Sequence, residues 1–183
     1  MQNDPIPTIT TERLKLRPFE VTDARSIQRL AGAEEIAATT LNIPHPYKRG
    51  MAEGWMRGQA ADWHERTNLV LAITTENNGL VGAISLKLEI THRRAELGYW
   101  IGVPFWNRGY ATEAAEAMIF FGFNELSLNR IEAQFFGENV ASGRVMQKIG
   151  MTYEGVLREY VVKGYALLDS VRYAILHKEY DEK

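Results

Sequence analysis

The sequence feature that most constrains the fold is a series of three strand-like segments that leads directly into a long amphipathic helix. Apolar residues dominate residues 69–74, 80–90 and 95–103. The sequence Glu-Asn-Asn-Gly at 76–79 separates the first two, and Asn and Gly tolerate the positive φ of tight hairpin turns. A second turn falls at 92–94. Because short turns join antiparallel neighbours, these segments predict three antiparallel strands.

The helix that follows is predicted over residues 111–126, where small or apolar residues recur at helical spacing. They are Ala111, Ala115, Met118, Ile119, Gly122 and Leu126. The rest of the chain is predicted to supply a strand at 14–19, helices at 22–30, 49–65 and 140–149, and strands at 130–136, 152–162 and 168–176. This order of elements predicts an α/β fold with a mixed sheet.

Composition bounds the chemistry that is available. A length of 183 residues fits one domain. The chain contains no cysteine, which excludes a disulfide scaffold, a thiolate metal site and a cysteine nucleophile. The four histidines are not paired at metal-ligand spacing, so no metal site is predicted and surface or capping roles are the simpler interpretation. They are His45, His64, His92 and His177.

Charge and hydropathy exclude two classes of partner. The net charge of −2 argues against a direct nucleic-acid partner, because such binders are usually basic. No apolar run approaches the roughly 18 residues of a membrane span. The N-terminus lacks the basic and then apolar order of a signal peptide. We therefore expect a cytoplasmic protein without a membrane partner.

Residues 98–112 carry the most chemical information, because a predicted strand ends there and a long helix begins. The first turn of a helix leaves backbone N–H groups without partners. Gly109 lets the backbone approach a ligand closely, since it has no Cβ. With Arg108, Ala111 and Thr112, it predicts an anion cradle suited to a diphosphate. Taken alone, the segment also fits a plain structural turn, because it lacks the glycine patterns of P-loop and Rossmann turns.

Five segments in register carry a resemblance to a known family. Residues 106–111 resemble the Gln/Arg-x-x-Gly-x-Gly/Ala motif that holds the coenzyme A pyrophosphate in the GNAT superfamily of N-acetyltransferases. Gly109 and Ala111 match this motif, and Trp106 departs at its first position, as is common in the RimJ/RimL-like branch of ribosomal-protein N-terminal acetyltransferases. The other similar segments are 11–18, 95–101, 139–151 with its Asn-x-x-Ser and Gly-Met sequences, and the closing hairpin with Gly155, Gly164 and Asp169. The similarity extends over residues 11–180.

The resemblance implies a single acetyltransferase domain over residues 1–183, with a core of about 9–180. It implies a mixed, mostly antiparallel central sheet, flanked by helices, in which the fourth and fifth strands splay apart. Acetyl-CoA is implied as the cosubstrate, with its pantetheine arm between those strands and no metal. The residues implied to bind it are Ile101 and Val103 and the side chain of Asn139 along the pantetheine arm, and the amides of Arg108, Gly109, Tyr110, Ala111 and Thr112 at the diphosphate.

The general acid is less strongly indicated. Many family members place a tyrosine seven residues after the motif asparagine, where this chain has Met146, which cannot donate a proton. Ser142 occupies the place of a serine that members of this branch are thought to aim at the coenzyme sulfur. A serine hydroxyl can donate a hydrogen bond to a thiolate. The alternative is that Ser142 only helps Asn139 to cap a helix.

The general base has two candidates. Some family members use a glutamate five residues before the motif asparagine, where this chain has the non-ionisable Gln134. Glu96 lies on the predicted fourth strand, on the same face as Gly98 and Trp100, and is the first candidate. Glu159 on a late strand is the second. For each carboxylate, a solvated or salt-bridged role is the alternative.

The function that the resemblance implies is transfer of an acetyl group to a primary amine, with a protein N-terminal α-amine as the acceptor. Polyamines and antibiotics are alternative acceptors, because related enzymes of this branch acetylate them. A non-catalytic acyl-CoA-binding sensor is a further alternative, motivated by Met146 and Gln134 in place of the usual acid and base. A homodimer is compatible with the sequence.

Overall fold

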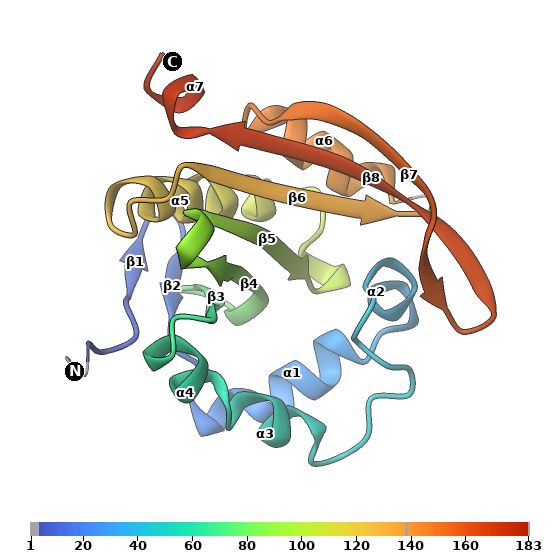
Figure 1. The fold of residues 1–183 in the computed structure, drawn as a ribbon. Coiled ribbons are helices and arrows are strands. Elements are labelled where there is room, and N and C mark those ends of the chain that lie inside the picture. The colour runs from blue at the N-terminus through green and yellow to red at the C-terminus, as the bar shows by residue number, and fades with distance from the viewer. Residues whose placement is uncertain (1–3, 138, 183) are drawn as a thin grey trace.

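One mixed sheet of eight strands organises the part of the chain that the computed structural model describes, residues 4–137 and 139–182 (Figure 1). The strands are β1 (Ile9–Thr10), β2 (Lys15–Arg17), β3 (Asn68–Thr75), β4 (Gly79–Glu89), β5 (Arg94–Ile101), β6 (Arg130–Phe136), β7 (Thr152–Lys163) and β8 (Ala166–Leu176). They lie in the order β1-β2-β3-β4-β5-β6-β8-β7. Each neighbouring pair is antiparallel except β5 and β6, which are parallel. The predicted mixed, mostly antiparallel sheet is confirmed.

Helices cover both faces of this sheet (Figure 1). They are α1 (Ala24–Ala31), α2 (Glu34–Thr39), α3 (Met51–Met56), α4 (Gln59–His64), α5 (Tyr110–Asn124), α6 (Val140–Lys148) and α7 (His177–Asp181), with short 3-10 turns η1 (Val21–Asp23), η2 (Ile90–His92) and η3 (Val103–Phe105). Met118 of α5 and Met146 of α6 join Leu71 and other sheet residues in the larger apolar cluster. The neighbouring Ala72 packs instead with α1 and α3. Alternate residues of a strand point to opposite faces, so β3 anchors both layers.

The sheet opens at its centre, between β5 and β6. Their parallel register ends at the pair Leu97 and Ala133. Beyond it, β5 continues along β4 as far as Ile101, and β6 continues along β8 as far as Phe136. The two strands are therefore paired with their outer neighbours but not with each other. Since β1 adds one strand at the start, β5 and β6 are the predicted fourth and fifth strands, and their splaying is confirmed.

The prediction of one helix over residues 49–65 is wrong. The structure divides this segment into α3 and α4, which are separated at Arg57 and Gly58. A glycine within a helix costs about 1 kcal/mol relative to alanine, so Gly54 and Gly58 weaken a continuous helix. Trp63 of α4 is buried, with 4% of its surface exposed.

Three short elements were not predicted from the sequence: β1, α2 and α7. Each contains six residues or fewer. A segment of this length is too short to show a hydrophobic period. The one with functional consequences is α2, because its carbonyl end contacts both the β7–β8 hairpin and the segment that begins α6.

Two findings concern the described ranges as a whole. None of the helices in residues 4–137 and 139–182 is long and apolar enough to cross a membrane. Within the same ranges, no group of three or more His, Asp or Glu side chains is arranged to hold a metal ion.

A buried ion pair fastens β2 to the start of α1. The Arg17 guanidinium donates to both carboxylate oxygens of Asp23, at 2.7 and 2.9 Å, and the Glu20 N–H donates to the same carboxylate at 2.8 Å. Asp23 is only 6% exposed. Burial alone would raise the pKa of Asp23, but the hydrogen bonds from Arg17 and Glu20, together with the Arg17 charge, lower it below its usual value.

Arg17→Gln is expected to lower the free energy of unfolding by about 3–5 kcal/mol, because it leaves a buried carboxylate unpaired. The matched variant Arg94→Gln removes an exposed pair with Glu89 and should cost at most about 1 kcal/mol. Urea denaturation at pH 7 measures both. Because the folded-state pKa of Asp23 is lowered, the stabilisation is present above about pH 4 and is lost as the pH falls through the folded-state value. Equal, small losses for the two variants would contradict this role.

Candidate functional site

The connection from β5 to α5 is shaped by two residues with left-handed backbone conformation. Asn107 has a φ of 59° and Gly109 a φ of 79°, and α5 begins at Tyr110. An ideal Cβ added to Gly109 would lie 3.3 Å from Arg13 Nη2. A side chain at this position would therefore be strained by its backbone conformation and crowded by Arg13.

The backbone amides of this connection are free. In the described part of the chain, no acceptor bonds the N–H groups of residues 108–112, and the first amide to find one is that of Glu113, which donates to the Gly109 carbonyl at 3.1 Å. Consecutive amides at a helix N-terminus form a site for an anion. The geometry therefore fits the predicted diphosphate cradle at Arg108, Gly109, Tyr110, Ala111 and Thr112.

Arg13, from the β1–β2 connection, braces the cradle. Its Nη1 donates to the Arg108 carbonyl at 3.0 Å, and its Nε donates to Glu113 Oε2 at 2.7 Å. The other oxygen of Glu113 accepts from the Thr11 hydroxyl at 2.6 Å and from the Arg13 N–H at 2.9 Å. Burial raises the pKa of Glu113, but these hydrogen bonds and the Arg13 charge outweigh it and lower the pKa. Glu113 is thus ionised and paired, so its charge does not oppose an anion at the first turn of α5.

Trp106 occupies backbone groups that were expected to meet the pantetheine arm. Its indole Nε1 donates to the Ile101 carbonyl at 2.5 Å, and its N–H donates to the Val103 carbonyl at 3.2 Å. The N–H of Gly102 donates to Val81 on β4. Because strand residues alternate in direction, the N–H groups of Tyr99 and Ile101 point to the opposite side, toward the opening between β5 and β6.

Asn139 and Ser142 lie at the start of α6, as predicted. Asn139 Oδ1 accepts from the Ser142 N–H at 3.3 Å and so caps the helix, while its Nδ2 donates to the Thr39 carbonyl of α2 at 3.5 Å. The Ser142 hydroxyl lies 2.9 Å from the Tyr99 hydroxyl. Met146, where a tyrosine is usual, is 1% exposed and belongs to the core.

Glu96 belongs to a row of hydrogen-bonded side chains on the face of the sheet opposite to Tyr99. Its Oε1 accepts from Gln134 Nε2 at 2.6 Å, and Gln134 Oε1 accepts from the Ser170 hydroxyl at 2.7 Å. Ser170 is completely buried. The structure thus brings Glu96 into direct contact with Gln134, so the two positions that the sequence singled out for the base lie together.

The second base candidate, Glu159, lies apart from this row. It is exposed, has a φ of 51°, and its N–H donates to Asp169 at 2.8 Å. It lines a surface hollow of ≈ 680 Å³ along the β7–β8 hairpin. Its backbone belongs to the irregular stretch of β7 between Leu157 and Val161, and Glu96 is the candidate nearer to the opening between β5 and β6.

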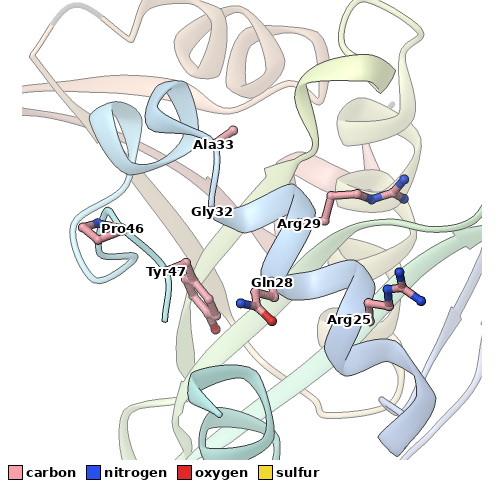
Figure 2. Close-up of a pocket in the computed structure, with 7 residues that line it drawn as sticks. All are labelled: Arg25, Gln28, Arg29, Gly32, Ala33, Pro46 and Tyr47. Carbon is pink, nitrogen blue, oxygen red and sulfur yellow. The ribbon is translucent and has the colours of Figure 1, made fainter. Parts of the chain in front are cut away.

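A separate surface hollow of ≈ 480 Å³ lies against α1, and Figure 2 shows Arg25 and Arg29 projecting from that helix. Its lining residues are Arg25, Gln28, Arg29, Gly32, Ala33, Pro46 and Tyr47. None of them is a predicted acid, base or cosubstrate-binding residue.

Roles for three residues of the site were not predicted from the sequence: Arg13, Tyr99 and Trp106. Arg13 and Tyr99 fall in segments that matched the family pattern, and Trp106 was noted only as a departure from a motif. Their contacts reach across 5 to 100 residues of sequence, to Ile101, Ser142 and Glu113. Sequence spacing does not show such contacts, although an arginine next to a motif is a usable signal for an anion site.

Comparison with known proteins shows the family. The model of the acetyltransferase (GNAT) domain matches residues 13–152. The uncharacterized N-acetyltransferase YnaD of Bacillus subtilis (strain 168) is 32% identical over 94% of this chain and 99% of its own. YdaF of the same organism, which carries a provisional name as a ribosomal N-acetyltransferase, is 30% identical over 93% of this chain and 94% of its own. A GNAT-family acetyltransferase structure from Bacillus anthracis superimposes with a TM-score of 0.84 at 29% identity, over 94% of this chain and 100% of its own.

Two solved structures with bound cosubstrate share the fold at lower identity. The ribosomal L7/L12 α-N-protein acetyltransferase RimL in complex with coenzyme A has a TM-score of 0.86 at 16% identity, over 94% of this chain and 99% of its own. The microcin C7 self-immunity acetyltransferase MccE in complex with acetyl-CoA and AMP has a TM-score of 0.82 at 17% identity, over 91% and 93%. At these identities the likeness concerns the fold alone.

Gly109→Ala is expected to weaken coenzyme A binding by at least about tenfold. A Cβ at φ 79° costs about 1–2 kcal/mol in the left-handed conformation, so the cradle relaxes away from its shape. Gly79→Ala is the matched control, because Gly79 has a φ of 61° in the β3–β4 turn and open space around it. Titration calorimetry with coenzyme A measures both. Equal affinities for Gly109→Ala and the wild type would contradict the cradle.

Proposed function

This chain belongs to the GNAT acetyltransferase family, and we propose that it transfers the acetyl group of acetyl-CoA to the α-amine of a protein N-terminus. That it is an acetyltransferase follows from the family. The acceptor is the part that we propose. The main support for an acetyl-CoA site is the row of free amides at residues 108–112, next to the opening between β5 and β6.

The name of one relative supports a protein acceptor. YdaF, at 30% identity over nearly the whole chain, carries a ribosomal N-acetyltransferase name. The opening strand and the Asn-x-x-Ser segment also follow the RimJ/RimL-like pattern. A ribosomal-protein acceptor would place the enzyme in the cytoplasm. We further propose that residues 9–180 form one domain, which the single sheet from β1 to β8 supports.

The residues present fit acetyl-CoA. The free amides of residues 108–112 suit its diphosphate, with Arg13 and Arg108 as nearby positive charges. The unpaired edge of β5 suits the amide-rich pantetheine arm, through Ile101 and with the Asn139 side chain near the start of α6. The Ile101 carbonyl already accepts from the Trp106 indole, and the Val103 carbonyl accepts from the Trp106 N–H, so each has one lone pair left for that arm. Bound in this way, acetyl-CoA supplies an activated acetyl thioester.

Residues of this chain then serve as base, as hydrogen-bond donor to the thioester and as acid. Glu96, held by Gln134, accepts the proton that the acceptor ammonium must lose before its nitrogen can attack. An N–H group at the open edge of β5, at Tyr99 or Ile101, donates a hydrogen bond to the thioester oxygen as negative charge develops there. Ser142 donates its hydroxyl proton to the sulfur that leaves.

The acceptor is tested by measuring thiol release with a panel of amines. We expect turnover on peptides with a free N-terminus and none on the same peptides acetylated at that end. Spermidine and free amino acids form the second arm, and preference for either would transfer the proposal to a small-molecule acceptor. Tight acetyl-CoA binding without turnover on any amine would favour a sensor and contradict an enzymatic role.

Ser142→Ala is expected to lower kcat by about 10²-fold while the affinity for coenzyme A changes little, because removal of a general acid slows only the chemical step. The substitution keeps the Ser142 N–H that donates to Asn139, so the helix cap survives. Steady-state kinetics and calorimetry separate the two quantities. An unchanged kcat would reduce Ser142 to a residue in the first turn of α6.

A further inference from the structure

Tyr99 brings a phenol hydroxyl to the start of α6. It lies on β5, two residues beyond the last pair that joins β5 to β6. Its hydroxyl is 2.9 Å from Ser142 Oγ and 3.1 Å from the Ser142 carbonyl oxygen. No other side chain in residues 4–137 and 139–182 contacts the Ser142 hydroxyl at hydrogen-bond distance.

The two hydroxyls have two protons to share, and their placement decides what Ser142 can do. If Tyr99 donates to the Ser142 carbonyl oxygen and Ser142 donates to Tyr99, the Ser142 proton is not available to a substrate. If Tyr99 donates to Ser142 Oγ, the Ser142 O–H is left free to point elsewhere. The second arrangement is the one that a proton donor at Ser142 requires.

Tyr99 is also the better proton source of the two. A serine hydroxyl is a far weaker acid than a phenol, so Ser142 alone is a poor proton source. Burial raises the pKa of Tyr99 to about 12. Tyr99 therefore stays protonated at neutral pH and remains a donor. The buried Met146, at the usual place for a tyrosine, cannot take this role.

We propose that Tyr99 is a positioning residue that orients the Ser142 hydroxyl and resupplies the proton that Ser142 gives away. The inference rests on the proposed function, in which Ser142 is the acid. It assigns to Tyr99 of β5 the phenol that the resemblance to GNAT enzymes leads one to expect on α6, where this chain has Met146, and the proton is delivered through Ser142 rather than directly.

In the proposed step the acceptor nitrogen forms a bond to the acetyl carbon, and the carbon–sulfur bond of the thioester breaks. Ser142 gives its hydroxyl proton to the sulfur that keeps the electron pair of the breaking carbon–sulfur bond, and it takes the Tyr99 hydroxyl proton in return. Tyr99 is left as a phenolate. It regains a proton from solvent through Ser142 once the free thiol has left. The acceptor nitrogen loses two protons, one from the ammonium before it attacks and one after its bond to the acetyl carbon has formed, and each passes in turn through Glu96 to solvent.

Tyr99→Phe tests the proposal, with Tyr173→Phe as the matched control. Tyr173 lies on β8, is also buried, and accepts a hydrogen bond from Gln147 of α6 at 3.2 Å. We expect Tyr99→Phe to lower the single-turnover rate of acetyl transfer by about 10–10²-fold, with the Kd for coenzyme A within about threefold of the wild type. Tyr173→Phe should leave that rate within about threefold, because its hydroxyl bonds with Gln147 and not with Ser142.

Three further measurements distinguish proton transfer from Tyr99 to Ser142 from a purely structural hydrogen bond between them. The double variant Tyr99→Phe/Ser142→Ala should be no slower than Ser142→Ala, because residues that act as a unit are not additive. In mixtures of H₂O and D₂O, the wild-type rate should fall along a bowed curve, as expected for two protons in motion, and the Tyr99→Phe rate along a straight line. In the free protein, Ser142→Ala should shift the ¹³Cζ resonance of labelled Tyr99.

The outcomes are distinguishable. If Ser142→Ala keeps the full rate, both the acid role of Ser142 and this inference fail. If Ser142→Ala is slow and Tyr99→Phe is not, the proposed function stands and the inference is overturned. Multiplicative losses in the double variant overturn it, as does a loss of coenzyme A affinity in Tyr99→Phe as large as the loss in rate. Should Tyr99→Phe fail to fold, a straight wild-type curve in the isotope mixtures overturns it by itself.

Discussion

The separation of β5 from β6 is the constraint on which the rest of the site depends. A parallel pair that stops after Leu97 and Ala133 leaves backbone groups on both inner edges without strand partners. Buried backbone groups are almost always hydrogen-bonded, so an opening in the middle of a sheet needs another occupant. In this chain the outer pairings, with β4 and with β8, keep the two strands in place. The opening is therefore held by the fold, and it offers main-chain donors to an extended ligand.

The cradle at the start of α5 depends on a tight turn, which Arg13 holds in place through contacts with residues far away in the sequence. Arg13 joins the Arg108 carbonyl to the Glu113 carboxylate across about a hundred residues of sequence. Its charge offsets a carboxylate that would otherwise repel an anion at the helix N-terminus. Hydrogen bonds to a charged ligand contribute about 1.5–3 kcal/mol each, more than the helix dipole, so the shape of the turn decides affinity.

The sequence predicted the fold well where patterns are local. The strand at Arg130–Phe136 and the Asn139 cap of α6 were placed correctly, because alternation and capping are properties of neighbouring residues. The splayed strands came from the family resemblance, since no residue pattern encodes them. The single helix over 49–65 failed because its apolar spacing does not show the break at Arg57 and Gly58. The partners of Tyr99 and Arg13 could not be predicted, because they come together only when β5, α6 and the β1–β2 connection pack.

The most direct test of the account follows the backbone amides of residues 108–112 by nuclear magnetic resonance during titration with coenzyme A and, separately, with pantetheine. Coenzyme A should shift these N–H resonances strongly and slow their exchange with solvent, because its diphosphate accepts their hydrogen bonds. Pantetheine, which has no diphosphate, should leave them unchanged while it shifts the resonances of Tyr99 and Ile101. Saturation with coenzyme A that leaves the amides of residues 108–112 unshifted and freely exchanging would contradict the account.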